Sequence, residues 1–286
     1  MDPQTFMEIA NVVTKLKMYP YFDVANYILM SIMVREDNHP QTAGSQLFSR
    51  KHPLACWIAT MLLCFAGSIL GNLLVGEPLI LPFKNHQDLL TATAVWYLVN
   101  YSPFDLVYKL SKFLPFKLTI ACLKEIQRAH KIQHGVQYAM KLYPGSYVII
   151  GIIGVLKGAG YYYMRAFERL VRGLWFPATN EILQPAFVTK GSLAATIIFI
   201  LEKKGYIDAP HAVIYFGVVI FFIYFRLSSL LLGIHDPFVP FENLFCAIFM
   251  GGVVDAMRRA LSREKVEENA QNARNAAKSK DEKKND

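Results

Sequence analysis

The chain has 286 residues, of which 53% are hydrophobic, and it carries a formal net charge of +8. Soluble domains have an apolar share of about 45–50%. Residues 255–286 are almost wholly polar, so the rest of the chain is richer in apolar residues than the average indicates. This distribution predicts a membrane-embedded body with a solvated end and argues against a soluble enzyme. Because many basic residues lie between or inside apolar runs, we expect anionic lipid as a partner and no nucleic acid.

The sequence contains no recognisable catalytic or metal-binding motif. Its four cysteines lie in apolar stretches without CxxC spacing, as expected of small buried hydrophobic residues. The HExxH, Walker A and GxSxG motifs are missing. His130 and His134, spaced i,i+4, are on their own too few ligands to indicate a metal site. We therefore predict that the protein is not an enzyme and that it holds no metal and no cofactor other than bound lipid.

Seven apolar segments are candidates for membrane-crossing helices, each of which needs roughly 20 mostly apolar residues. Pro53–Gly76 is the clearest, because it contains no Asp, Glu, Lys or Arg. We predict an all-α membrane protein with seven transmembrane helices. In chain order the expected spans are Met18–Val34, Pro53–Gly76, Leu89–Phe104, Leu118–Met140, Leu142–Leu156 with its continuation GAGYYYM, Ile182–Leu201 and Ala209–Phe225.

Lysine and arginine are more frequent on one side of these spans than on the other. The positive-inside rule then predicts a lumenal N-terminus and a cytosolic C-terminus. Phe238–Val254 is apolar but contains Glu242, so we interpret it as an interfacial or packed helix, with an eighth crossing as the alternative. The predicted parts are a lumenal segment at 1–17, a seven-helix transmembrane domain at 18–235, an apolar and interfacial segment at 236–261, and a polar cytosolic tail at 262–286.

Three of the expected spans contain charged residues at membrane depth. Asp23 lies in the first, several Lys and Arg lie in the fourth, and Lys190 lies in the sixth. Such groups are costly in a bilayer and usually face a bundle interior or a water-filled path. The pattern therefore predicts an aqueous conduit, with Thr189 and Lys190 as candidate pore-lining residues. The alternative is that Thr189 and Lys190 mark the start of a helix.

The fourth expected span carries a basic stripe, formed by Lys117, Lys124, Arg128 and Lys131. At helical periodicity these residues fall within about 60° of one another. The stripe is either a cytosolic extension whose side chains snorkel, or a functional surface. A functional surface would bind a phosphoinositide headgroup near the cytosol. Deeper in the membrane it would sense voltage, since one charge crossing the field is worth about 2.3 kcal/mol per 100 mV.

Glycines are concentrated in the second and fifth expected spans. The second contains Gly67 and Gly71 at GxxxG spacing, and the fifth contains GIIGVLKGAG at 151–160. They either permit close helix packing or break the helices where backbone lines a cavity. Each span is the middle of a three-helix set, and paired interruptions of this kind indicate inverted repeats. Lys157, beside the second candidate break, would face either the pore or an anionic lipid.

Several longer strings resemble one known family. KEIQRAHKI, KGAG, HPLACW, GEPLI, AVWYLVNYSPFDLVYK and RGLWFPATNEIL are similar to the trimeric intracellular cation (TRIC) channels of animals, and the similarity runs from about residue 20 to about 235. The resemblance implies a homotrimer in the endoplasmic or sarcoplasmic reticulum, with one pore per protomer passing potassium as counter-current to calcium release. It also implies two inverted three-helix repeats plus a seventh helix, with the second and fifth helices broken at glycines.

The resemblance also assigns roles to individual residues. Lys124 and Arg128 would contact phosphatidylinositol 4,5-bisphosphate, the expected bound lipid. Lys131 would be the candidate voltage sensor or gate. The glycine string of the fifth span corresponds to Lys157, Gly158, Ala159 and Gly160. In the second span, where Gly67-Ser68 is followed by ILGNLL, the position of the hinge stays open.

These observations favour a potassium-permeable channel of an intracellular membrane that is gated by lipid, voltage or calcium. The C-terminus ends in Lys283-Lys284-Asn285-Asp286, which is similar to the dilysine signal for retrieval to the endoplasmic reticulum. One alternative is a secondary transporter with inverted repeats, which would use the same broken helices. Another is a phosphoinositide-binding membrane protein that does not conduct.

Overall fold

The computed structural model describes residues 2–37, 49–174, 185–233, 236–251, 254 and 258–259. These residues are helical or lie in turns and connections, with no β-strand among them. The chain divides into two compact units, Met1–Asp236 and Pro237–Asp286. The principal helices of the first unit are α1 (Pro3–Thr14), α2 (Tyr21–Asp37), α4 (Pro53–Cys64), α5 (Ala66–Val75), α6 (His86–Tyr101), α7 (Leu106–Lys112), α8 (Leu114–Leu142), α9 (Tyr147–Val171), α10 (Phe187–Lys203) and α11 (His211–Leu232).

Local sequence explains where several of these helices begin and end. The side chain of Asn85 caps α6 by accepting a hydrogen bond from the backbone N–H of Gln87 at 3.2 Å. Pro53 starts α4, in the first turn, where a missing N–H costs nothing. Gly76 ends α5 and Gly233 ends α11, both in the left-handed conformation that glycine adopts readily.

The second expected span is bent. Its two halves, α4 and α5, meet at Phe65 with an angle of 68°. The bend precedes Gly67, which lies inside α5, so this glycine does not form the hinge. A Cβ added at Gly67 would lie 2.9 Å from the carbonyl oxygens of Leu156 and Lys157 on α9. Gly67 therefore allows α5 to approach the backbone of α9.

The fifth expected span is not broken. Helix α9 is continuous through 151–160, which corrects the expectation of a break at its glycines. A Cβ at Gly160 would lie 2.6 Å from the Cα of Gly67, and one at Gly158 would lie 2.5 Å from the side chain of Ile132. Ala159, between them, is fully buried. Of the two interpretations of this string, close helix packing is confirmed.

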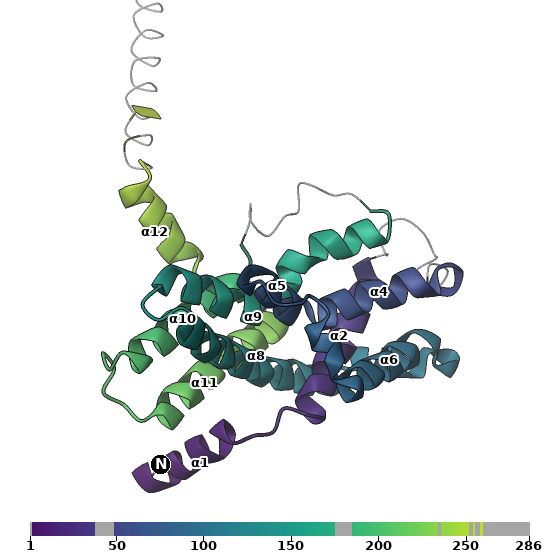
Figure 1. Cartoon of the computed structure of the whole chain (residues 1–286), viewed down its shortest axis with the longest axis horizontal. Helices are drawn as coiled ribbons and strands as arrows, with labels where there is room; N and C mark the ends of the chain where they lie inside the picture. Colours follow the sequence, from purple (N-terminus) through teal and green to yellow (C-terminus); the bar gives the residue numbers. More distant parts are fainter. Residues whose placement is uncertain are drawn as a thin grey trace, which may run out of the picture. The chain divides into compact units, whose positions relative to one another are not determined.

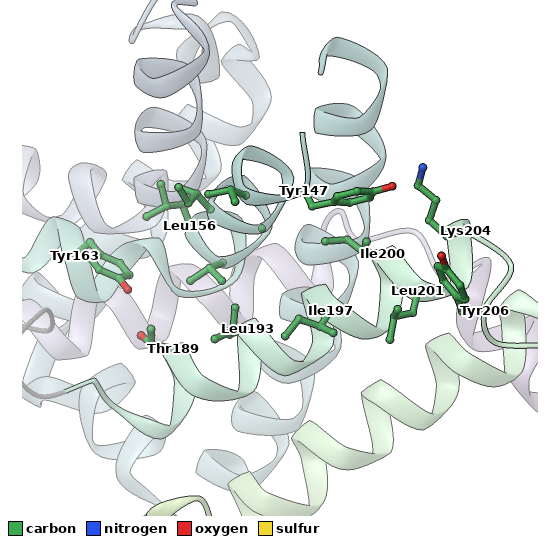
Figure 2. A pocket seen from close by; sticks show the side chains of 14 residues that line it. Tyr147, Leu156, Tyr163, Thr189, Leu193, Ile197, Ile200, Leu201, Lys204 and Tyr206 are labelled. Carbon is green, nitrogen blue, oxygen red and sulfur yellow. The ribbon is translucent and has the colours of Figure 1, made fainter. Parts of the chain in front are cut away.

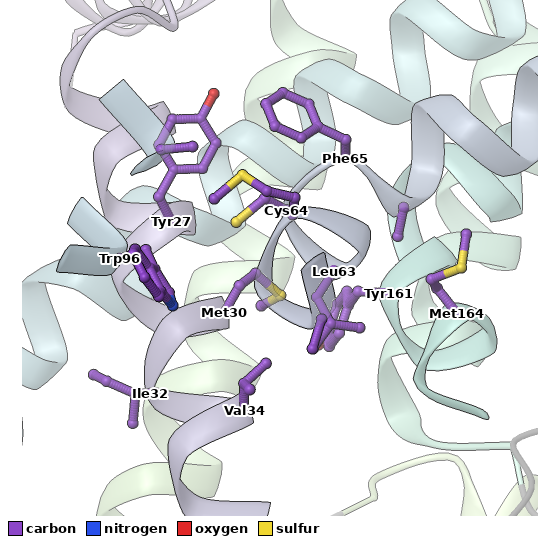
Figure 3. Close-up of a cluster of buried hydrophobic side chains, with 14 of the residues drawn as sticks. Tyr27, Met30, Ile32, Val34, Leu63, Cys64, Phe65, Trp96, Tyr161 and Met164 are labelled. Atoms are coloured by element: carbon purple, nitrogen blue, oxygen red, sulfur yellow. The ribbon is translucent and has the colours of Figure 1, made fainter. Parts of the chain in front are cut away.

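Helix α9 joins two hydrophobic clusters. The first is built from α2, α4, α5, α6 and α9 with Val188 of α10, and it includes Tyr27, Cys64, Trp96 and Met164 (Figure 3). The second is built from α8, α9, α10 and α11. In Figure 1, α8 and α9 cross the middle of the first unit, and each contacts helices on both sides. The two three-helix sets are thus linked through α9, which contributes side chains to both clusters.

The N-terminal segment contains a helix that the sequence reading did not anticipate. Helix α1 lies beside α11 (Figure 1). The rings of Phe6 and Phe216 meet edge to face there, with their centroids 5.4 Å apart. The apolar stretch of this segment is too short to predict a membrane span. Its apolar side chains are instead available for α11.

Helices α9 and α11 are each long and apolar enough to cross a membrane, and the bent pair α4–α5 qualifies if it forms one span. Among the described residues no other helix meets the same combination of length, hydropathy and low charge. Seven spans therefore remain a prediction. Helix α8 is long enough, at 29 residues or about 43 Å, but it carries many charged side chains.

The second unit contains α12 (Val239–Phe249), an apolar helix with no buried residue. Phe241, Leu244 and Phe249 are among its exposed side chains. An interfacial position for this helix stays a prediction. The polar tail expected at 262–286 lies outside the described residues.

The contact between α5 and α9 predicts different effects for two identical substitutions. Gly160→Ala should lower the apparent melting temperature in detergent, because overpacking typically costs about 1–3 kcal/mol. Gly151→Ala is the matched control, since its Cβ would meet no atom within 4 Å in the same helix. Heating followed by size-exclusion chromatography measures both. Equal melting temperatures would contradict the backbone contact at Gly67.

Candidate functional site

The basic stripe of α8 faces the interior of the first unit. Lys124 and Arg128 are 7% and 3% exposed, and Gln127 and Glu125 beside them are 0% and 1% exposed. Snorkelling side chains would keep their charged ends in water. The interpretation of the stripe as a snorkelling extension is therefore wrong for this part of the helix.

Polar groups of α2 meet this buried face. The ammonium of Lys124 donates a hydrogen bond to Asn26 Oδ1, and the amide of Gln127 donates one to Asp23. The Lys124 ammonium also lies 5.2 Å from the ring centroid of Tyr161 on α9, within cation–π range. Buried charges are tolerated when such partners surround them.

Arg128 is held from two sides. Its guanidinium forms an ion pair with Glu125 on the same helix and lies 5.7 Å from the ring of Phe222 on α11. Its Nε is buried and has no hydrogen-bond partner within the described residues. Arg128 therefore has one buried donor that no described group satisfies.

Lys157 passes through a notch formed by two glycines. A Cβ at Gly71 of α5 would lie 3.4 Å from its ammonium nitrogen, and one at Gly135 of α8 would lie 2.7 Å from its Cγ. Larger residues at either position would displace the lysine side chain. Gly71 is thus a packing position for Lys157, and Gly135 is a member of the site that sequence reading missed.

A small cavity lies where α5, α8 and α9 meet, and we call it the central cavity. Its volume is about 20 Å³. Its wall includes the amides of Asn26 and Gln127 and the small residues Gly67, Gly158 and Gly160. Four cationic side chains complete the polar part of the wall: Lys124, Arg128, Lys131 and Lys157. The structure therefore brings together all the expected lipid, gate and α9 string residues except Ala159, which is buried next to them.

A wider cavity, which we call the basic pocket, opens beside the same face of α8. Its volume is about 450 Å³, and it shares Lys124, Arg128 and Tyr161 with the central cavity. Its cationic lining residues are Lys112, Lys117, Lys124, Arg128, Arg165 and Arg226, and its carboxylates are Glu36, Asp37 and Glu125. The cationic groups outnumber the carboxylates, so the pocket suits a polyanion.

One carboxylate beside the basic pocket binds three arginines. Asp37, the last residue of α2, accepts hydrogen bonds from Arg169 at 2.8 and 2.9 Å, from Arg172 at 2.7 Å and also from Arg165. Arg172 is bonded to Glu168 as well, at 3.0 Å. We call this group the Asp37 clamp. It ties the C-terminal end of α2 to that of α9.

The clamp changes the titration of its carboxylate, which lies beyond the expected span. Burial alone would raise the pKa of Asp37. The hydrogen bonds from the three guanidinium groups outweigh burial and hold this pKa well below its ordinary value. Asp37 is therefore ionised throughout the physiological pH range.

Thr189 and Lys190 lie apart from the central cavity. They belong to the first turn of α10, which begins at Phe187, so the alternative of a helix start is confirmed. Lys190 forms an ion pair with Asp236 at 2.7 Å. Thr189 lines an apolar groove of about 800 Å³ between α9 and α10, with Tyr163 near it and Tyr147 and Lys204 at the far end (Figure 2). This groove is large but offers little polar chemistry.

The described side chains do not form a group of three His, Cys, Asp or Glu that could hold a metal ion. His130 and His134 stack on each other, with ring centroids 6.3 Å apart, and no third ligand joins them. The chemistry of the site is therefore that of buried cationic and amide groups.

Buried charges facing a bent apolar helix are typical of helical membrane proteins that move ions or solutes. Comparison with known sequences makes the class specific: the sequence model of the family described as TRIC channel matches residues 42–233. The chain belongs to the TRIC channel family, whose members are ion channels and not enzymes. The resemblance stated from the sequence is confirmed.

Individual relatives agree with this membership. The chain is 51% identical over 263 residues to trimeric intracellular cation channel type 1B.1 of Caenorhabditis elegans, covering 92% of this chain and 88% of the relative. It is 37% identical to trimeric intracellular cation channel type A of Gallus gallus, covering 86% and 82%. A solved trimeric intracellular cation channel from C. elegans, in the absence of Ca²⁺, matches with a TM-score of 0.76 and 48% identity, covering 82% of this chain and 100% of that one.

A further solved structure concerns the structural basis for activity of TRIC counter-ion channels in calcium release. It matches with a TM-score of 0.74 and 32% identity, over 79% of this chain and 99% of that one. The fold of the first unit is therefore shared with TRIC channels over most of its length.

Sequence reading missed the Asp37 clamp. Arg165, Arg169 and Arg172 lie beyond the fifth expected span, although their spacing places them on one face of a helix. Asp37 stands just beyond an expected span, which gave no sign of its partners. If the fifth expected span had been extended past Leu156 as one continuous helix, the three arginines would have been predicted on one face of it.

The clamp predicts a large effect of a small substitution. Asp37→Asn should destabilise the protein by about 3–5 kcal/mol, because it leaves the guanidinium groups without their shared carboxylate. Glu8→Gln, at an exposed position of α1, is the control. Melting temperatures in detergent measure both, and an unchanged value for Asp37→Asn would contradict the clamp.

The pH dependence of the clamp follows from the direction of the Asp37 shift. A depressed folded pKa gives a stabilisation that is complete above the ordinary carboxyl pKa of about 3.9 and is lost as the pH falls below it. The melting-temperature difference between the wild type and Asp37→Asn should thus be constant from about pH 5 to 8. A difference that shrinks toward pH 5 would show that another group controls it.

Proposed function

We propose that this protein is a potassium-permeable cation channel of the endoplasmic or sarcoplasmic reticulum membrane that supplies counter-ion current during calcium release. Membership of the TRIC channel family supports the proposal. So do the relatives, which are trimeric intracellular cation channels, and the similar structure of a TRIC counter-ion channel in calcium release. By the same likeness the assembly is a homotrimer with one pore in each protomer.

The proposed topology follows the order of the helices. The spans are α2, the bent pair α4–α5, α6, α8, α9, α10 and α11, with the N-terminus lumenal and the C-terminus cytosolic. The first three spans and the next three form the inverted repeats, and α11 is the seventh helix. The contacts of α5 with α9 and of α2 with α8 support this pairing, because they join elements of the two sets.

One observation carries the proposal: the buried charged face of α8 lies opposite the bend between α4 and α5. Buried charges are expensive in a membrane protein unless they serve a path or a ligand. Lys124, Gln127 and Lys131 all line the central cavity, at the level of Cys64, the last residue of α4. In this proposal the central cavity is the narrowest part of the potassium path.

The size of the central cavity suits a closed gate. A single water needs about 10–15 Å³ of such space, and the cavity offers about 20 Å³. Lys157, in its notch between Gly71 and Gly135, and Lys131 are the gating candidates, since moving either would widen the constriction. Amides and backbone carbonyls would then replace part of the hydration shell of potassium.

The basic pocket is the proposed site for phosphatidylinositol 4,5-bisphosphate. Its volume of about 450 Å³ falls in the range of small-molecule sites, about 300–1,000 Å³. Lys124 and Arg128 line it, and Arg128 Nε is unpartnered within the described residues. Phosphate groups would accept hydrogen bonds from these donors. Lys117, which is only half-buried, lines the same pocket.

Planar-bilayer recording of the purified protein tests conduction. We expect unitary current steps carried by potassium. Saturable uptake and counterflow in liposomes without unitary steps would overturn the proposal in favour of an inverted-repeat transporter. Lipid binding without any flux would favour a non-conducting lipid-binding protein.

Lipid binding is tested with three variants. Lys124→Ala with Arg128→Ala should abolish retention on vesicles containing phosphatidylinositol 4,5-bisphosphate, and Lys117→Ala should weaken it without removing a buried charge. Lys141→Ala, at an exposed position of α8 outside the pocket, is the control. Only protein that elutes as a single species is compared. Undiminished binding by both the double variant and Lys117→Ala would rule out the basic pocket.

A further inference from the structure

The central cavity has a wall of unusual charge. Four cationic side chains line it, and its lining includes no Asp or Glu. Two of the four, Lys124 and Arg128, are more than nine-tenths buried. A cavity of this kind presents several positive groups to one small volume, with little water to separate them.

The partners of these cations leave most of the charge uncompensated. Arg128 has Glu125 as its counter-ion, but Lys124 donates to the neutral amide of Asn26. Within the described residues, the ammonium groups of Lys131 and Lys157 have neither a hydrogen-bond nor an ion-pair partner. Three lysines therefore face the cavity without a carboxylate in contact.

Three further carboxylates act on the lysines of the cavity from a distance, and their hydrogen bonds come from neutral donors. Asp23 of α2 accepts a hydrogen bond from Gln127. Glu77, which follows α5, accepts one from the hydroxyl of Tyr138, and Asp88 of α6 accepts one from Asn85. None of the three lines the cavity. Because unpaired charge in a water-poor cavity is unfavourable, a further negative group here would stabilise the lysines.

We propose that the central cavity binds one small monatomic anion, of which chloride is the common example. The space of about 20 Å³ admits one water-sized particle, whereas a phosphate group needs the wider basic pocket. Lys131 and Lys157 line the central cavity and not the basic pocket, so they distinguish the two sites.

The unpartnered carbonyl oxygen of Gln127 fits this arrangement. Gln127 is fully buried and lines the cavity, and its Oε1 has no partner within the described residues. An oxygen repels an anion but accepts a hydrogen bond from an ammonium group. A lysine ammonium that donates one hydrogen bond to Gln127 Oε1 and another to the anion would satisfy both the oxygen and the anion.

The anion has a consequence for conduction, which rests on the proposed function. Three uncompensated lysines at the narrowest point repel potassium. When the constriction widens, an anion held by Lys131 and Lys157 beside the path lowers this repulsion, so the cation current should depend on which anion is present. The anion then acts as a bound counter-charge and is not itself transported.

Binding is tested first, without reference to conduction. Crystals of the purified protein grown in potassium bromide should show one anomalous bromide peak per protomer, next to Lys131 and Lys157. The apparent melting temperature should also be higher in potassium chloride than in potassium gluconate of equal ionic strength. Lys131→Gln and Lys157→Gln should reduce this difference, and Lys141→Gln should keep it. A central cavity without bromide, or an equal chloride effect in all variants, would overturn the anion site.

Conduction is tested second. At constant potassium, replacing chloride by gluconate on both sides of a planar bilayer should lower the unitary potassium current several-fold. Bromide should restore the current. If the protein binds bromide but passes no potassium in either salt, the anion site stands and the proposed channel function is wrong. A potassium current that is equal in both salts would overturn the role of the anion in conduction.

Discussion

The approach of α5 to α9 at Gly67 and Gly160 is the constraint on which the rest of the site depends. A Cβ on Gly160 would lie 2.6 Å from the Cα of Gly67, so only glycine permits this separation. Small residues at such contacts are a common means of packing membrane helices, because lipid offers no hydrophobic drive for their association. The contact fixes α5, the second half of a bent span, against a continuous helix.

The same contact sets the position of Lys157. Its side chain leaves α9 beside the Gly67 contact and enters the notch of Gly71 and Gly135. It therefore touches α5 and α8 at once. Any change in the separation of α5 and α9 would move this ammonium group relative to the buried face of α8. The gate that we propose is thus coupled to backbone packing, and not only to the rotamer of one lysine.

Helical periodicity predicted the stripe on α8 but not the direction in which it points. The angle between Lys124 and Arg128 follows from sequence, whereas the partners of Lys124, Asn26 and Tyr161, lie on other helices. A bend in the second span was predicted, and its position at Phe65 was not, because the glycines were read as hinges. In α9 the glycines permit close packing against other helices. Whether the helix stays continuous there depends on those neighbouring helices, which a single sequence does not reveal.

A cation path walled by lysines is not a contradiction in electrostatic terms. Selectivity requires that potassium meet a favourable potential, and this potential is the sum of all charges near the path, including bound ligands. In our proposals a phosphoinositide would supply negative charge in the basic pocket, and a small anion would do so in the central cavity. Lys124 and Arg128 border both spaces, so a ligand in one changes the potential in the other. The lysines thereby make the charge of the path depend on what is bound, which a fixed ring of carboxylates would not do.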